Sequence, residues 1–244
     1  MARDRAVIRV IPTILFNGAG HVVKGRAFAA DRVVGALIDA VSTYQMREVD
    51  ELVLLDAWAT REGRGPNIPL LAEVAKRLRS PCAIGGGLRS MADVDALYRA
   101  VPVDKIVIGT RIDLCEPIAA RYGRQAVVLS VVHGNPVSYP ARDVPPPSCF
   151  EPAPILYSHV GEVLLQSRSR DGTMGGYALD TVRAFAKALT CPVIASGGCS
   201  GPEDMHAALR AGADAVAAGA LFAFTDTTPA DCKRYLAGRG WEVR

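Results

Sequence analysis

The residues best suited to chemistry are glycines that follow short apolar runs. Gly86-Gly87 and Gly197-Gly198 end two such runs, and Gly109-Thr110 and Gly219-Ala220 end two more. Glycine lets the backbone approach a ligand closely, and the N–H groups that open a following helix favour phosphate. These positions therefore predict a phosphate site in each half of the chain. Tight turns without a ligand are the alternative.

A polar loop adds further candidate groups for an anion. Residues 168–177 read RSRDGTMGGY and follow the apolar run at 162–166. Here Asp171, Gly172 and Thr173 can turn tightly and offer a hydroxyl and backbone amides. Asp171 is also a possible acid or base.

These glycines belong to a block that occurs twice, at 81–110 and at 192–221. Each copy runs from a proline through an apolar strand, a glycine cluster and an amphipathic helix to a second apolar strand. The similarity extends upstream, where VDELVLLD at 49–56 matches VGEVLLQS at 160–167. A period near half the chain length indicates two related halves, about 1–122 and 123–244.

Eight apolar runs alternate with helical patterns, which predicts a parallel sheet with right-handed crossovers. Eight units in two equal halves favour a closed (β/α)8 TIM barrel over 1–244, rather than an open doubly wound sheet. In such barrels the chemistry sits at the C-terminal ends of the strands. The predicted strands are 7–15, 51–56, 82–84, 105–108, 126–132, 162–166, 193–195 and 215–218. The predicted helices are 31–47, 68–79, 91–100, 114–122, 179–189, 203–211 and 229–239.

The proline-rich segment 134–154 interrupts this alternation. It holds seven prolines and cannot form a continuous helix. A surface loop, a lid over the site and a contact with a partner all remain open for it.

Composition excludes several classes of protein. Half of the 244 residues are hydrophobic, and the net charge is only +3, too weak to indicate nucleic-acid binding. Six cysteines show neither a CxxC pair nor metal-ligand spacing, so we expect reduced, mostly buried thiols and no metal. We also expect no signal peptide, no membrane span and no cofactor, and a cytoplasmic location.

Several motifs together resemble one family. VVKG, DELVLLD, GGGLRS, DKIVIGT, IASGG and AAGALF are similar to the cyclase subunit of imidazole glycerol phosphate synthase, the ammonia-using barrel of histidine biosynthesis. RVIPTILFNGAG and RDGTMGGY look more like a paralogue that helps to amidate nucleotide-linked sugars. The resemblance implies that a class I glutaminase docks at the N-terminal face of the barrel. Ammonia would then pass along the barrel axis to a phosphorylated substrate at the C-terminal face.

The resemblance also implies roles for particular residues. Lys24 would help to hold phosphate, Asp56 would belong to the active site, and Asp104 would contact the glutaminase. The charged gate of the ammonia channel would consist of Arg9, Glu51, Lys105 and Glu162. For these four, a purely structural ring of ion pairs is the alternative.

Two positions depart from the family pattern. Leu15 and Val132 stand where the family has its catalytic aspartates, at the ends of the first and fifth strands. Neither side chain can move a proton, and a placed acid or base typically contributes about 10²–10⁴-fold in rate. We therefore expect poor imidazole closure, with Lys24, Asp56 and Asp171 as the remaining candidate catalytic residues. His133 is a further possible base.

Three functions follow as hypotheses. The first is an ammonia-accepting synthase subunit of a glutamine amidotransferase pair, with a phosphorylated or nucleotide-linked acceptor outside histidine biosynthesis. The second is a histidine-pathway cyclase with altered catalytic residues. The third is a non-catalytic, phosphate-binding barrel that activates a glutaminase.

Overall fold

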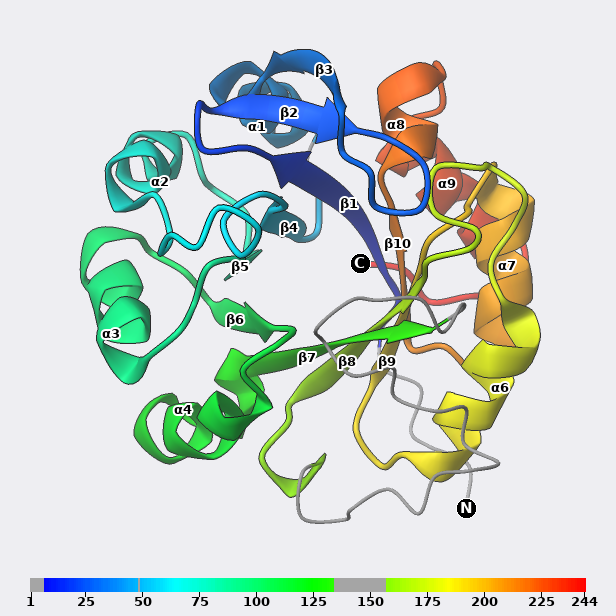
Figure 1. Cartoon of the computed structure of the whole chain (residues 1–244). Coiled ribbons are helices and arrows are strands. Elements are labelled where there is room, and N and C mark those ends of the chain that lie inside the picture. The colour runs from blue at the N-terminus through cyan, green and yellow to red at the C-terminus, as the bar shows by residue number, and fades with distance from the viewer. Residues whose placement is uncertain (1–6, 48, 134–156) are drawn as a thin grey trace.

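The computed structural model describes residues 7–47, 49–133 and 157–244. Its strands form one sheet, in which eight parallel strands close into a barrel because β1 pairs with both β4 and β10 (Figure 1). This confirms the predicted (β/α)8 fold. The barrel strands are β1 (Arg9–Phe16), β4 (Leu52–Asp56), β5 (Cys82–Gly85), β6 (Lys105–Ile108), β7 (Val127–His133), β8 (Glu162–Ser167), β9 (Val193–Ser196) and β10 (Ala215–Ala218).

Alternate residues of each strand face the barrel interior, as the pleat of a strand requires. The inward-facing apolar side chains pack into one cluster, separate from the larger core between strands and helices. The interior is therefore a filled layer of small and branched side chains rather than an open pore. The buried members of this inner cluster are Ile11, Val53, Ala83, Val107, Val128, Leu164, Ile194, Ala215 and Ala217.

Helices cover the outside of the barrel (Figure 1). Two of them begin with reciprocal capping boxes, Ser90 with Asp93 and Thr228 with Asp231, which fix where the helix starts. The helices are α1 (Leu37–Met46), α2 (Ile68–Ala75), α3 (Met91–Ala100), α4 (Cys115–Tyr122), α6 (Leu179–Ala188), α7 (Pro202–Arg210), α8 (Ala220–Phe224) and α9 (Pro229–Ala237), with 3-10 turns η1 (Ile112–Leu114) and η2 (Arg124–Ala126).

The helix predicted over 31–47 is wrong in its first third. Residues Arg32–Ala36 form β3, which pairs antiparallel with β2 (His21–Lys24), and α1 begins only at Leu37. The segment reads RVVGA, and β-branched valines beside a glycine favour a strand over a helix. This hairpin lies at the C-terminal end of β1 (Figure 1).

The other predicted helices differ from the structure mainly at their ends. The one predicted over 68–79 ends at Ala75, and the one over 114–122 is preceded by a 3-10 turn. Five cysteines lie in the described residues, and all five are buried free thiols. The proline-rich segment 134–154 and Cys149 lie outside the described residues. No helix among those described is long and apolar enough to cross a membrane.

Candidate active site

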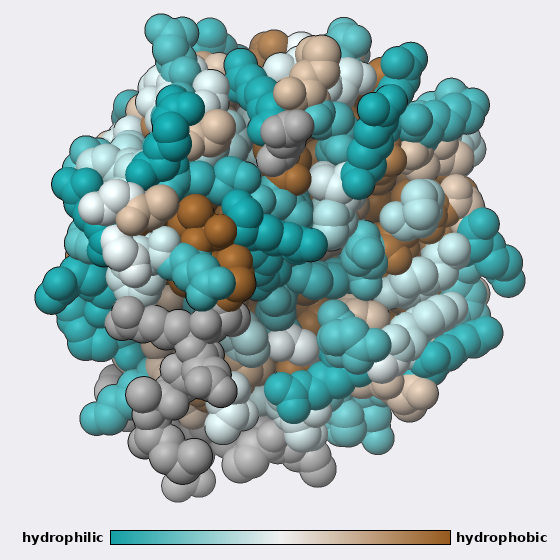
Figure 2. All heavy atoms as spheres, turned by 180° about the vertical axis from the view of Figure 1, so that it is seen from behind, coloured by the Kyte–Doolittle hydropathy of each residue, from teal (hydrophilic) through white to brown (hydrophobic). Residues whose placement is uncertain are grey.

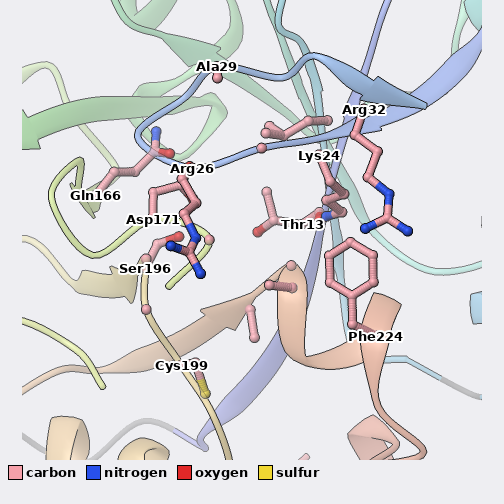
Figure 3. Close-up of a pocket in the computed structure, with 18 of the residues that line it drawn as sticks. Thr13, Lys24, Arg26, Ala29, Arg32, Gln166, Asp171, Ser196, Cys199 and Phe224 are labelled. Atoms are coloured by element: carbon pink, nitrogen blue, oxygen red, sulfur yellow. Dashed lines mark hydrogen bonds between the residues drawn. The ribbon is translucent and has the colours of Figure 1, made fainter. Parts of the chain in front are cut away.

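A cavity of about 540 Å³ lies at the C-terminal ends of β1, β8, β9 and β10. The hairpin β2–β3 and the loop after β8 form its other walls (Figure 3). The lining combines three basic side chains, two carboxylates and several glycines, so the site suits an anionic ligand. The charged and polar lining residues are Thr13, Lys24, Arg26, Asp31, Arg32, Gln166, Asp171, Ser196 and Cys199.

Lys24 is the buried cation of this cavity. It ends β2, is only 8% exposed, and its Nζ donates to the backbone oxygen of Thr13 at 3.3 Å. Burial lowers the pKa of Lys24 to about 8, although the nearby charge of Asp171 acts in the opposite direction. The ammonium form therefore still predominates at pH 7, and the group titrates only slightly above it.

Asp171 is a half-buried carboxylate in the wall of the same cavity. Burial raises its pKa, against the opposing effects of a hydrogen bond from Phe28 N (3.1 Å to Oδ2) and of the Lys24 charge. The loop that carries it packs tightly on the loop after β2. A Cβ on Gly172 would lie 2.2 Å from the oxygen of Gly25, and Gly172 has φ +70. Only glycine fits there, so Gly172 sets how Asp171 approaches the β2 loop.

The glycines of the second half line the cavity. Gly172, Gly197, Gly198, Gly219 and Ala220 all belong to its wall. A Cβ on Gly219 would meet the Lys24 Nζ at 2.8 Å, so this glycine brings the backbone next to the ammonium. Thr173 is not part of the lining, and its hydroxyl donates to the Arg170 backbone oxygen at 2.7 Å within its own loop.

The glycines of the first half are placed differently. Gly86, Gly87, Gly109 and Thr110 do not line this cavity. Gly86 and Gly87 have positive φ and press against the segment after β4, where a Cβ would meet Asp56 O at 2.4 Å or Ala59 Cβ at 2.8 Å. The segment at Gly109 and Thr110 is exposed, and a Cβ on Gly109 would meet nothing within 4 Å.

Asp56 has a full set of partners and does not line the cavity. Its carboxylate accepts from Arg64 at 2.6 and 2.9 Å and from the backbone N–H groups of Trp58 and Ala59. The hydrogen bonds that Arg64 donates to Asp56 are the main cause of the raised pKa of Arg64. Asp56 therefore does not share the cavity of Lys24 and Asp171. Its hydrogen bonds instead stabilise the loop after β4.

The two apolar residues that stand at the family's catalytic positions differ in their relation to the cavity. Leu15 lies in the cavity wall, whereas Val132 does not, although Val132 is in register with the lining residue Gln166. His133 follows Val132. Burial lowers its pKa, with a further effect of Arg170, and its Nε2 is buried without a hydrogen-bond partner in the described structure.

At the opposite end of the barrel, four charged side chains form a closed ring. Arg9 contacts Glu51 and Glu162, each at 2.5 Å, and Lys105 contacts the same two carboxylates, each at 2.9 Å. Burial acts against the charged forms, yet the two cations hold the pKa of Glu162 below its usual value and the two carboxylates raise that of Arg9. Each cation thus bridges both anions across the barrel floor.

A smaller cavity of about 340 Å³ borders this ring. It is lined by Lys105, Arg124, Gln125, Gly161 and Glu162, at the N-terminal ends of β6, β7 and β8. Figure 2 shows the side of the molecule opposite to Figure 1, where mostly hydrophilic side chains are interrupted by small hydrophobic areas.

Asp104 is exposed at the start of β6, on this same face. Its carboxylate accepts from the backbone N–H of Cys82 at 2.8 Å. Asp214 accepts from Val193 N at 2.8 Å in the second half, so the repeat preserves this strand-linking contact. Among the described residues, no three His, Cys, Asp or Glu side chains are grouped as metal ligands would be.

Comparison with known proteins identifies the family. The family model described as "Histidine biosynthesis protein" matches residues 9–228, which is most of the chain. The chain is 35% identical to the imidazole glycerol phosphate synthase subunit HisF of Corynebacterium diphtheriae, over 97% of this chain and 98% of that protein. The chain belongs to this family. The same subunit is 37% identical in Nocardioides sp. (97% and 98% covered) and 35% identical in Mycobacterium bovis (97% and 95% covered).

Membership of the imidazole glycerol phosphate synthase cyclase family confirms the resemblance in the sequence. It also supports the second functional hypothesis, the histidine-pathway cyclase, better than the first, because the relatives carry that name over nearly their whole length.

Sequence reasoning missed part of the cavity wall, namely Thr13, Arg26, Asp31, Arg32, Gln166, Ser196 and Phe224. The two-residue alternation along β1 and β8 gave a usable signal for Thr13 and Gln166, which follow Ile11 and Leu164 on the inward face. Arg26 and Arg32 could be found only once the segment after VVKG was recognised as a hairpin.

Proposed function

We propose that this chain is the ammonia-using cyclase subunit of an imidazole glycerol phosphate synthase; its relatives are named as a subunit of that synthase. The observation that carries the proposal is the arrangement along one barrel. A closed ring of four charges lies at the N-terminal end, and an anion-binding cavity lies at the C-terminal end. The first suits the entry of a small molecule, and the second suits a phosphorylated substrate.

Ammonia enters through the ring formed by Arg9, Glu51, Lys105 and Glu162. Each cation is held by two carboxylates, so the floor is closed until a side chain moves. A class I glutaminase docked on this face supplies the ammonia. The exposed Asp104 and the small cavity beside Lys105 are available to such a partner.

The substrate's phosphate binds in the main cavity. The Lys24 ammonium lies beside Gly219, and the glycine loops after β8, β9 and β10 bring backbone close to the ligand. In Figure 3 the side chains of Lys24, Arg26 and Arg32 enter the same space from the β2–β3 side. A second phosphate group would lie at Gly86, Gly87, Gly109 and Thr110, on the first half of the barrel.

Lys24 and Asp171 are the titratable pair of the cavity. Burial lowers the pKa of Lys24 to about 8 and raises the pKa of Asp171 above its ordinary value. A group that titrates near the working pH is an effective general acid or base, which fits Lys24. Lys24 and Asp171 take over proton transfer where Leu15 and Val132 cannot, while Asp56, bound to Arg64, positions the loop beside the site.

One specific observation favours a second candidate. Leu15 presents an apolar side chain to the cavity where the family has an acid or base. Addition of ammonia to an activated carbonyl needs less proton transfer than closure of an imidazole ring, because positioning supplies much of the rate. The alternative is thus amination of a phosphorylated or nucleotide-linked acceptor outside histidine biosynthesis.

Growth of a histidine-requiring strain that lacks its cyclase subunit tests the two candidates. Rescue by the native sequence is expected for the histidine-pathway function. Rescue only by the Leu15→Asp/Val132→Asp double variant would contradict that function and favour the other acceptor. Equal expression and an unchanged melting temperature of the two proteins are the controls.

A further inference from the structure

The side chains inside the barrel form layers along its axis, and a single strand such as β1 contributes one residue to each layer. On β1 the inward residues are Arg9 in the charged ring, Ile11 in the apolar cluster, Thr13, and then Leu15 in the cavity wall. On β8 the order is Glu162, Leu164 and Gln166. Both strands therefore place a polar side chain between the apolar layer and the substrate cavity.

The Thr13 hydroxyl has no hydrogen-bond partner among the described residues. The residue is 8% exposed, it lines the cavity, and its Oγ1 is buried with no hydrogen bond in the described structure. Lys24 contacts Thr13 only through the backbone oxygen. Because a buried hydroxyl without a hydrogen bond is costly, a Thr13 Oγ1 without a partner in the described structure indicates a small polar ligand.

Gln166 offers a complementary group. Its Nε2 donates to the Ser130 hydroxyl at 2.7 Å, which fixes the orientation of the amide. Within the described structure its Oε1 accepts no hydrogen bond, and the residue lines the same cavity as Thr13. An oriented amide oxygen is a hydrogen-bond acceptor with both lone pairs available.

We propose that Thr13 and Gln166 form a binding site for neutral ammonia at the exit from the apolar layer. Ammonia carries N–H donors and a lone pair. The Gln166 oxygen accepts an N–H, and the Thr13 hydroxyl can donate to or accept from the nitrogen. The site rests on the proposed function in so far as ammonia arrives through the barrel. It adds the step at which ammonia leaves apolar surroundings and is presented to the substrate.

The site is tested without any acceptor substrate. The γ-methyl resonance of isotope-labelled Thr13 is followed while ammonium chloride is added, at a pH high enough for neutral ammonia to be abundant. Sodium chloride at equal ionic strength is the control, and the methyl of Thr228, the N-cap of α9, is the reference. We expect a saturable shift at Thr13 with ammonia alone. In Gln166→Leu, half-saturation should need roughly two- to tenfold more ammonia, the effect of one lost hydrogen bond.

Absence of a saturable shift at Thr13 would overturn the site, whatever the protein catalyses. Because this readout needs neither a glutaminase nor an acceptor, failure of the proposed function is recognised separately, as absence of product from the native protein. Where product forms, Thr13→Val and Gln166→Leu should raise the KM for ammonia. Unchanged KM in both variants would contradict the inference, and an unchanged melting temperature shows that the variants are folded.

Discussion

Removal of one carboxylate from the charged ring should cost far more stability than removal of an exposed one. Glu51 is 2% exposed at its side chain and contacts both Arg9 and Lys105. Breaking a buried pair costs about 3–5 kcal/mol, because an uncompensated charge remains. Glu162 still contacts both cations, so we expect the lower end of that range for Glu51→Ala, about 3 kcal/mol.

Urea unfolding followed by circular dichroism measures this loss. The matched control is Glu73→Ala, which removes an exposed i,i+3 pair with Lys76 and should change the free energy of unfolding by less than about 0.5 kcal/mol. A cost for Glu51→Ala as small as that of the control would refute the reasoning, since it would mean that water reaches the ring. Arg9→Ala combined with Glu51→Ala should cost less than the sum of the two single variants.

The change of the free energy of unfolding with pH provides a second test of the same ring. Arg9 and Lys105 hold the pKa of Glu162 below its ordinary value of 4.5, against the effect of burial. Its contribution is therefore complete above about pH 4.5 and is lost as the pH falls through the lowered folded-state pKa. Glu162→Gln should flatten this part of the profile of stability against pH. An unchanged slope would contradict the ring's effect on Glu162.

Three further predictions concern the cavity and the partner face. Phosphate affinity, measured by calorimetry, should begin to fall as the pH rises past about 8, where Lys24 loses its proton, and Lys24→Arg should remove that fall; a native profile that stays flat to pH 9 would contradict it. Gly172→Ala should weaken phosphate binding, because its Cβ would overlap Gly25 O. Gly63→Ala, with a similar φ and open space around it, should lower the free energy of unfolding by about 1–2 kcal/mol through backbone strain and leave phosphate affinity unchanged. Equal phosphate affinity in the two variants would argue against the tight loop contact. Asp104→Asn should keep the hydrogen bond from Cys82 and hence stability, yet weaken glutaminase binding; unchanged affinity would leave Asp104 a purely structural residue.

The sequence predicted the barrel well because its signal is local and repeated. Each half carries the same order of strand, glycine cluster, helix and strand, and the charged residues at strand starts point inward by simple alternation. Glu51 and Glu162 are repeat partners, and the structure places them in one ring.

The β2–β3 hairpin and the ion pair of Asp56 with Arg64 could not be predicted in the same way. The β2–β3 hairpin replaces the start of a helix because RVVGA pairs with residues 21–24, and no periodicity within 31–47 reveals that partner. The family resemblance assigned Asp56 to the active site, and in the structure Arg64, eight residues later, binds its carboxylate. The hairpin and the Asp56–Arg64 ion pair depend on contacts between segments, and a pattern within one segment cannot predict such contacts.

The most direct test of the account is the fate of the glutamine amide nitrogen. The barrel is mixed with its glutaminase, the phosphorylated acceptor and amide-¹⁵N-glutamine, in the presence of excess unlabelled ammonium. Passage through the barrel predicts a product that retains most of the ¹⁵N label, and loss of that retention on Glu51→Ala. A product whose label equals that of the mixed ammonium pool would contradict the account, because the ammonia would then have reached the cavity from solvent.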